Sequence, residues 1–471
     1  MRTGEAGLAR ESSRVRVGSS AYLGARQREY IASSQRHVGV PSPAGSSRPC
    51  RSGHDNVFFR LIGKRLSRVL FAALLGVFAG SEAVFAQGVF DRPRPDYDPI
   101  GVPAGGFRIF PTLDVGLFQD DNVYRTQTNT REDIFVEVAP AIAVRSQWAV
   151  HMLNIAANLQ RYVYRNLSSE SQTNWFAGGD GRLDILRGIY FTGAGDYAEL
   201  HEPRTSPDLP GFAAKPTEYA NPHGQGALTY HPFRVGIEAG GIFDRFQYQD
   251  TPLVGGTFLH NKDRDREIYQ AYAKLSYDFS PGYAVFVRGT YDQWKYDLKA
   301  DRTGVDRDSD GEHFDAGLSL QVTQLVRGEI FGGYLDQHYK APLINISGPG
   351  YGSTLDWYPL EVLTIHLIAS RTQNATTITG ASATDDQHVG VGLDYELARD
   401  FLVQTTAGYT HSAFSGTTRI DKYSDAGVGL TWLVNRLISV SGRYAYSRRD
   451  SSLAGQNFAD NVFSIRIGFH P

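Results

Sequence analysis

The residues best arranged to bind a metal form a short acidic run, Asp306-Arg-Asp-Ser-Asp-Gly311. Oxygen ligands at alternate positions before a glycine are typical of the start of a calcium-binding loop. Such a loop also needs a glutamate at its twelfth position, which here is Gly317. Asp306, Asp308 and Asp310 are therefore a weak calcium candidate, and a solvated acidic loop is the preferred interpretation.

Residues suited to catalysis form no recognisable group. The 13 histidines are scattered without metal-ligand spacing. No glycine-rich phosphate loop follows a strand and opens a helix. The sequence predicts neither an enzymatic site nor a cofactor.

Charged residues instead recur on one face of a series of apolar segments, where they could line an aqueous pore. If carboxylates dominate that face, the pore has a negative potential and favours cations or neutral solutes over anions. The alternative is that opposite charges on neighbouring strands neutralise one another. The predicted pore-lining residues are Asp114, Glu137, Asp180, Arg182, Lys274, Arg288, Asp292, Asp315, Arg327, Glu329, Asp394, Glu396, Asp425, Arg443 and Arg466.

The segments that carry these residues alternate between apolar and polar side chains. In the last of them, Phe463, Ile465 and Ile467 alternate with Ser464 and Arg466. Successive side chains of a strand point to opposite faces, so each segment has one apolar and one polar face. Segments of about 9–13 residues are long enough for a tilted strand to cross a bilayer.

The links between the segments alternate between tight turns and long polar loops. Short turns at one end and long loops at the other are typical of an outer-membrane barrel, with the short turns in the periplasm. We predict an all-β fold, a transmembrane antiparallel up-and-down β-barrel of about 18 strands, with 16 as the alternative count. The predicted strands are 107–118, 134–144, 150–164, 173–185, 189–201, 219–230, 235–248, 266–279, 283–296, 312–322, 326–339, 351–358, 361–373, 387–397, 401–414, 422–434, 437–449 and 458–469.

The N-terminal region has the order of an export signal. Basic residues between Arg60 and Arg68 precede an apolar run from Val69 to Gly80, and small residues lead to Ala86. The run is far shorter than the ~20 residues of a membrane-spanning helix. The predicted parts of the chain are a non-native or disordered leader at 1–56, a signal peptide at 57–86, a Pro-rich periplasmic tail at 87–106 and the barrel at 107–471.

Removal of the leader would make the protein acidic. Of the 47 basic and 50 acidic residues, 13 and 5 lie within residues 1–86, which leaves a net charge of −11. This charge argues against nucleic acid as a partner. The single cysteine, Cys50, also lies in the leader, so the mature chain would have no disulfide and no thiol chemistry.

Two short stretches resemble a known family. The lead-in Asp91-Arg-Pro-Arg-Pro-Asp-Tyr-Asp-Pro-Ile-Gly101 and the motif Asp120-Asp-Asn-Val-Tyr124 flank the first strand. Together with that strand, they resemble the putative β-barrel porin 2 family of Gram-negative outer-membrane proteins, over residues 87–471. The resemblance implies a location in the cell outer membrane and a barrel fold, and some members of the family are associated with exopolysaccharide export.

We therefore expect a porin-like channel for small hydrophilic solutes, with a leaning toward cations. Two alternatives stay open: an outer-membrane component of exopolysaccharide export, and a non-conducting barrel with a structural or adhesive role. The expected partners are outer-membrane lipid and lipopolysaccharide, small hydrophilic solutes or polysaccharide, and the barrel-assembly machinery.

Overall fold

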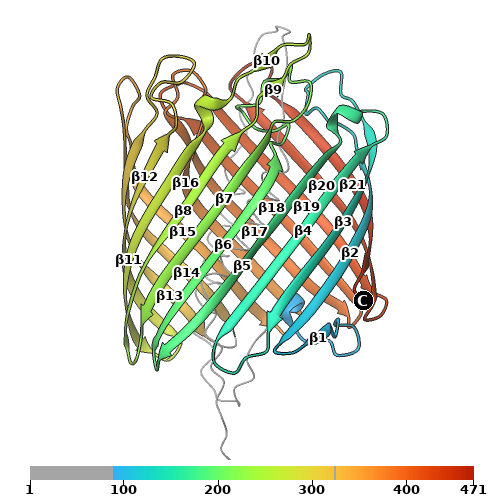
Figure 1. Cartoon of the computed structure of the whole chain (residues 1–471), viewed down its shortest axis with the longest axis vertical. Helices are drawn as coiled ribbons and strands as arrows, with labels where there is room; N and C mark the ends of the chain where they lie inside the picture. Colours follow the sequence, from blue (N-terminus) through green and yellow to red (C-terminus); the bar gives the residue numbers. More distant parts are fainter. Residues whose placement is uncertain (1–87, 323–324) are drawn as a thin grey trace, which may run out of the picture.

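The computed structural model of the chain describes residues 88–322 and 325–471. The predicted leader at 1–56 and signal peptide at 57–86 lie outside these residues. Within them, 18 long antiparallel strands form one closed barrel, so the predicted fold and strand count are confirmed (Figure 1).

Each barrel strand pairs with the next one along the chain in antiparallel orientation, and short strands and 3-10 turns lie at both ends of the barrel. The barrel strands are β2 (Phe107–Asp120), β3 (Asp133–Ser146), β4 (Met152–Tyr164), β5 (Gln172–Leu186), β6 (Ile189–His201), β7 (Glu218–Tyr230), β8 (Val235–Tyr248), β11 (Arg266–Ser280), β12 (Tyr283–Tyr296), β13 (Ser309–Val322), β14 (Val326–Tyr339), β15 (Ile346–Leu360), β16 (Leu363–Ala375), β17 (Ala383–Ala398), β18 (Phe401–Phe414), β19 (Ile420–Leu433), β20 (Ile438–Ser451) and β21 (Phe458–Phe469). The short elements are β1 (Val102–Ala104), β9 (Thr251–Pro252), β10 (Phe258–Leu259) and the 3-10 turns η1 (Val89–Asp91), η2 (Ser168–Glu170) and η3 (Lys262–Arg264).

The barrel closes where its first strand pairs with its last. β2 pairs with β21 from Leu113 opposite Phe469 to Asp120 opposite Val462. The first six residues of β2 extend beyond this seam, and β1 pairs with three of them, from Ile109 to Phe107. Because the ring is closed, each barrel strand has a hydrogen-bonded neighbour on both sides. The hydrocarbon of a bilayer requires this, since it offers backbone groups no hydrogen bonds.

Several predicted strand bounds differ from the observed ones, most of all at the long-loop end, where β15 begins five residues before the predicted 351 and β17 four residues before the predicted 387. The segment Gly348-Pro-Gly350 was expected in a loop because glycine and proline favour turns, yet β15 already begins at Ile346. Over this stretch β15 pairs with β14 alone, since its pairing with β16 starts at Gly352. Proline is tolerated there because its missing N–H lies on the unpaired edge.

Side-chain alternation separates two faces of the wall. In β17, Val391 and Leu393 are 39% exposed on one face, whereas Asp394 and Glu396 on the other are 5% and 9% exposed. The exposed apolar face is the outer surface of the barrel, where it can contact lipid acyl chains.

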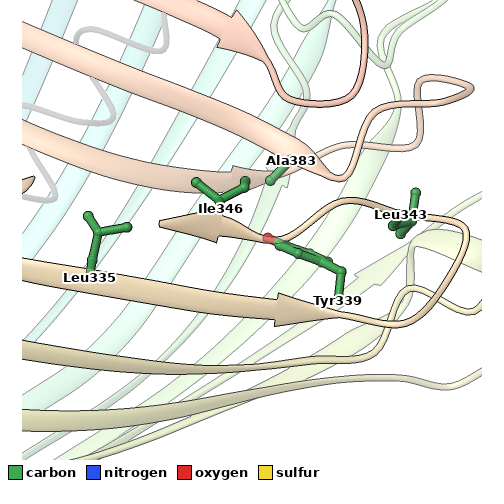
Figure 2. Close-up of a cluster of buried hydrophobic side chains, with 5 residues drawn as sticks. All are labelled: Leu335, Tyr339, Leu343, Ile346 and Ala383. Atoms are coloured by element: carbon green, nitrogen blue, oxygen red, sulfur yellow. The ribbon is translucent and has the colours of Figure 1, made fainter. Parts of the chain in front are cut away.

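Buried hydrophobic side chains cluster at the long-loop end of the barrel (Figure 2). Leu335 and Tyr339 of β14 pack with Ile346 of β15, Ala383 of β17 and Leu343 of the intervening loop. The cluster fixes the base of the loops that lie above it.

No helix in the described parts of the chain is long and apolar enough to cross a membrane.

Arginine substitutions on neighbouring strands test which face meets lipid. Val428 lies on the outer face, and Thr406 lies opposite Gly427 on the polar face at almost the same height. We expect Val428→Arg to lower the free energy of unfolding by about 2–4 kcal/mol, the cost of arginine near the bilayer midplane. Thr406→Arg should cost much less, because its face already carries charged groups. Denaturant titration in lipid bilayers measures both; equal losses would contradict the assignment of the faces.

Candidate functional site: the charged interior of the barrel

The polar face of the wall is the concave one. Lys274 of β11 forms an ion pair with Glu329 of β14, although two strands lie between them. Arg466 of β21 similarly pairs with Glu137 of β3 across β2. Side chains converge on the concave face of a curved sheet, so contacts that skip strands identify the interior.

All 15 predicted pore-lining residues lie on this interior face, at positions alternating with the outer apolar residues. Their role as a pore lining remains a prediction. What the structure adds is how they are connected to one another.

Most of the basic side chains among them are ion-paired. Besides the two pairs that skip strands, Arg288 contacts Asp315 at 2.9 Å, Arg182 contacts Asp184 at 2.6 Å and Arg327 contacts Asp356 at 3.1 Å. Glu396 pairs with Arg94, which precedes the barrel in sequence, at 2.7 Å. Outside these pairs, the predicted set holds five carboxylates, Asp114, Asp180, Asp292, Asp394 and Asp425, and one arginine, Arg443, which interacts electrostatically with Asp425.

Some of the remaining carboxylates contact histidines. His366 lies between Asp356 and Asp394, with its Nδ1 at 2.7 Å from one carboxylate and its Nε2 at 2.9 Å from the other. His313 lies 3.3 Å from Asp292. Asp356, near the short-turn end of β15, is not in the predicted set, although its alternation with Leu355 and Trp357 places it on the interior face.

Residues 88–98, called here the N-terminal strap, lie against the inner wall at the short-turn end (Figure 1). The sequence predicts an extended, solvated tail, but Val89 and Arg94 are almost fully buried. The Val89 N–H donates to Thr364 Oγ1 at 2.9 Å, and Arg94 donates to Glu396. Proline restricts the backbone conformation of the strap as expected. The side chain of Arg94 docks the strap to the barrel.

The opposite end of the barrel is covered by loops that reach one another across the opening. The loop 202–217 follows the fifth barrel strand, and the loop 376–382 follows the thirteenth of 18. Asp208 in the first loop accepts hydrogen bonds from the Thr376 hydroxyl and the Thr377 N–H, both at 2.8 Å. Strands eight places apart in the ring lie almost opposite, so this contact bridges the entrance.

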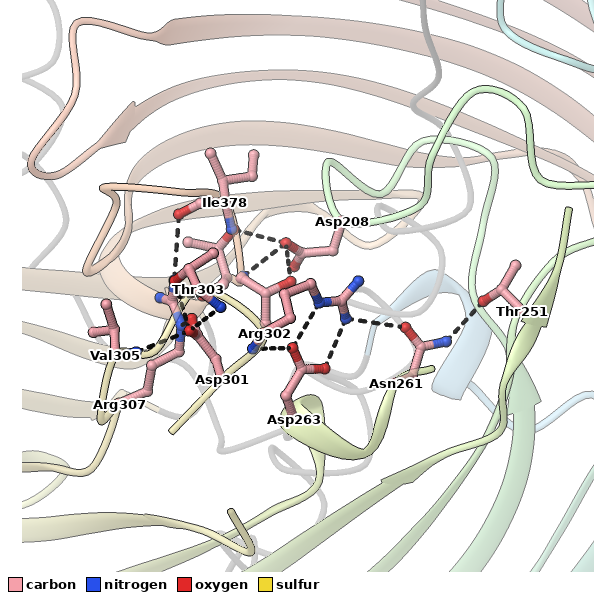
Figure 3. A network of polar contacts seen from close by, with 12 residues as sticks. Asp208, Thr251, Asn261, Asp263, Asp301, Arg302, Thr303, Val305, Arg307 and Ile378 are labelled. Carbon is pink, nitrogen blue, oxygen red and sulfur yellow. Dashed lines mark hydrogen bonds and ion pairs between the residues drawn. The ribbon is translucent and has the colours of Figure 1, made fainter. Parts of the chain in front are cut away.

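Arginines connect further loops to this bridge (Figure 3). Arg307, from the loop between β12 and β13, donates to the carbonyl oxygens of Thr376 and Ala381 at 2.7 and 2.8 Å. Arg302 of the same loop pairs with Asp263 of η3 at 2.6 Å. We call loops 202–217, 249–265, 297–308 and 376–382 the loop cap.

The weak calcium candidate has a different arrangement in the structure. Lys340 places its Nζ at 2.8 Å from Asp306 and at 2.9 Å from Asp308. Asp310 instead lies 3.9 Å from His338. The lysine ammonium therefore lies where a cation shared by Asp306 and Asp308 would lie.

Another acidic group comes together from distant parts of the chain. Asp120, Asp121 and Asp460 present carboxylate oxygens within 4.8 Å of one another. Arg125 bonds Asp120 at 2.8 Å and Asp460 at 2.7 Å, so a guanidinium already neutralises the group. Asp120 and Asp121 of this group belong to the family-like motif at 120–124. Through Arg125, the group connects the first long loop to β21 at the seam.

Sequence patterns do not reveal the loop cap or the strap. Alternation reports which face of a strand is apolar and is silent about loops. The partners Asp208 and Thr377 are 169 residues apart, and Arg94 and Glu396 are 302 apart. No local signal in the sequence identifies such pairs.

Acid should loosen the loop cap only at low pH. Burial alone would raise the pKa of Asp263 and Asp301, but hydrogen bonds from Arg302, Thr303, Val305 and Arg307 outweigh it and lower both pKa values below the ordinary 3.8. A carboxyl group with a lowered pKa stabilises the folded cap above its ordinary pKa and loses that effect as the pH falls through the lowered value.

We expect hydrogen-exchange protection of loops 249–265 and 297–308, corrected for intrinsic rates, to stay constant from about pH 7 to pH 5 and to fall below about pH 4. Asp263→Asn should lower protection of 297–308 already at neutral pH. A steep loss of protection between pH 7 and 5 would contradict this account.

Comparison with known proteins agrees with the geometry. Residues 94–470 match the family model described as putative beta-barrel porin 2. No match to the chain is found among curated protein sequences.

Several solved outer-membrane structures are similar at low identity. OccAB4 of Acinetobacter baumannii shares 12% identity at a TM-score of 0.40, covering 78% of this chain and 98% of that chain. OccK1 (OpdK) of Pseudomonas aeruginosa shares 11% at 0.41, covering 77% and 99%. The siderophore receptor PirA from A. baumannii shares 6% at 0.42, covering 77% and 80%. Identity at this level says nothing about cargo.

The family model spans most of the chain, and the strands close into the barrel that the family resemblance implied. The fold and the family are those of a channel. The chain belongs to the putative beta-barrel porin 2 family and is a porin-like channel of the outer membrane.

Proposed function

We propose that this channel passes small hydrophilic solutes and favours cations over anions. One observation carries the proposal: five of the six basic residues in the predicted lining set are paired with a carboxylate, and the set holds five further carboxylates, Asp114, Asp180, Asp292, Asp394 and Asp425, against one further arginine, Arg443. Excess carboxylates on a low-dielectric wall give a negative potential that concentrates cations.

The limit to small solutes follows from the two ends of the barrel. Bridging loops cross one opening, and the N-terminal strap lies inside the other. An 18-stranded ring is wide enough for an aqueous lumen, and these segments reduce the opening at each end.

The same wall disfavours export of an anionic polysaccharide. An anionic polymer would need a basic lining to offset its charge. In this barrel, Lys274, Arg288 and Arg466 are each paired with a carboxylate of the wall. Lipopolysaccharide and the barrel-assembly machinery remain predicted partners.

Reversal potentials across a salt gradient test the charge preference. We expect the purified protein in planar bilayers to show discrete openings with a reversal potential on the cation-selective side. The double variant Asp114→Asn/Asp425→Asn should shift that potential toward zero, because two interior charges are removed.

Asp310→Asn/Glu312→Gln is the matched control, since it removes two carboxylates from the outer face of β13. This control should leave the reversal potential unchanged. An anion-selective wild type, or equal shifts in both double variants, would contradict the cation preference. Complete absence of openings would instead favour the non-conducting barrel.

A further inference from the structure

We propose that the N-terminal strap is a latch at the short-turn mouth of the pore. With Arg94 paired to Glu396 the strap narrows the mouth, and when this pair breaks the strap swings about Gly101 and the mouth widens. The inference rests on the proposed channel function and adds a conformational step to it.

The strap follows the inner rim of the mouth. Asp91 approaches Arg327 of β14 at 3.9 Å, and the Pro95 carbonyl accepts a hydrogen bond from Arg436 in the turn between β19 and β20. The chain then enters β2 at Phe107. β14 is the eleventh strand of the ring and β2 the first, so the segment runs along nearly half of the circumference.

Few contacts dock the strap. Arg94 Nη2 donates to Glu396 Oε2 and to the Val89 carbonyl, both at 2.7 Å, and the two charged side chains are 5% and 8% exposed. Arg92 adds a longer contact of 3.5 Å to the same carboxylate. Glu396 is therefore the common acceptor for both arginines, and neutralising it leaves the longer Asp91–Arg327 contact as the remaining ion pair of the strap.

The docked state also has a cost. The Nε of Arg94 is buried and has no hydrogen-bond partner among the described residues. A buried donor without a partner loses its hydration with nothing in exchange. Release of the strap would return this group to water, which offsets part of the free energy that docking gains.

The strap is built to move as a unit. In one turn the Gly88 carbonyl accepts hydrogen bonds from the N–H groups of Asp91 and Arg92 at 2.9 and 3.0 Å. In a second turn the Arg94 carbonyl accepts one from the N–H of Asp98 at 2.7 Å. Behind it, Gly101 adopts a φ of +68°, a conformation natural to glycine, before β1 pairs with β2. A stiff segment joined through glycine to an anchored hairpin has a single place to bend.

The wall beneath the strap is fixed. Thr364, which accepts the Val89 N–H, lies two residues before His366, and Glu396 lies two residues after Asp394. The contact of His366 with Asp394 ties β16 to β17 just above the docking site. The strap therefore moves against a rigid surface.

Single-channel recording of the purified protein separates the two states. We expect the wild type to switch between a smaller and a larger conductance, and Glu396→Gln to lose the smaller one. Glu267→Gln is the matched control, because it breaks an Arg–Glu pair with Arg245 on the outer face of the barrel. It should switch like the wild type.

An engineered disulfide between the strap and the wall would hold the strap in the docked state, the opposite of the effect expected for Glu396→Gln. A Cβ placed on Gly88 would lie 3.8 Å from Thr364 Oγ1, the atom whose place the sulfur of Thr364→Cys would take, so cysteines at these two positions would lie side by side. In a Cys50→Ser background, the oxidised Gly88→Cys/Thr364→Cys pair should show only the smaller conductance, and a reductant should restore switching. Because this pair leaves Glu396 intact, it decides the question even if Glu396→Gln fails to fold.

Each outcome is decisive. If the oxidised pair, the reduced pair and the wild type conduct alike, the strap is not a latch while the channel function stands. If no variant conducts, the channel function fails and the latch fails with it.

Discussion

In the hydrocarbon of a bilayer, every backbone N–H and C=O group needs a hydrogen-bond partner within the protein, and this constraint determines the structure. A sheet can satisfy it only by closing on itself, and β2 and β21 do so although more than 340 residues separate Leu113 from Phe469. Once the ring is closed, the alternation of each strand sends one set of side chains to lipid and the other to the interior. The apolar outer face, the charged inner face and the end loops all follow from that closure.

Charged side chains that point into a closed barrel lie close together, so opposite charges form ion pairs. Lys274 and Glu329 find each other across two strands because interior side chains converge. The same convergence lets the long loops meet over one end and gives the Arg94 side chain a wall to dock on at the other. Pairing occupies most of the basic side chains in the predicted lining set, and the cation preference that we propose rests on the carboxylates outside those pairs.

The strands of the barrel wall could be predicted from the sequence, whereas the contacts at its two ends could not. The number of strands, their order and the interior side of residues such as Asp114 and Arg466 follow from a period of two, which is local. The start of β15 was misplaced because Pro349 looks like a turn residue unless the neighbouring edge is known to be unpaired. Asp208, Arg307 and Arg94 could not be assigned, since their partners lie far along the chain and no periodicity relates them.

The three-residue strand β1 bears on how the barrel avoids associating with other molecules. At the rim, β2 runs past the end of β21, so its outer edge would present free backbone donors and acceptors to water. β1 occupies part of that edge, with Pro103 in its centre unable to donate a further hydrogen bond. An exposed strand edge is a template for intermolecular pairing. The segment that leads into the barrel thus also shields the seam from recruiting a strand of a neighbouring chain.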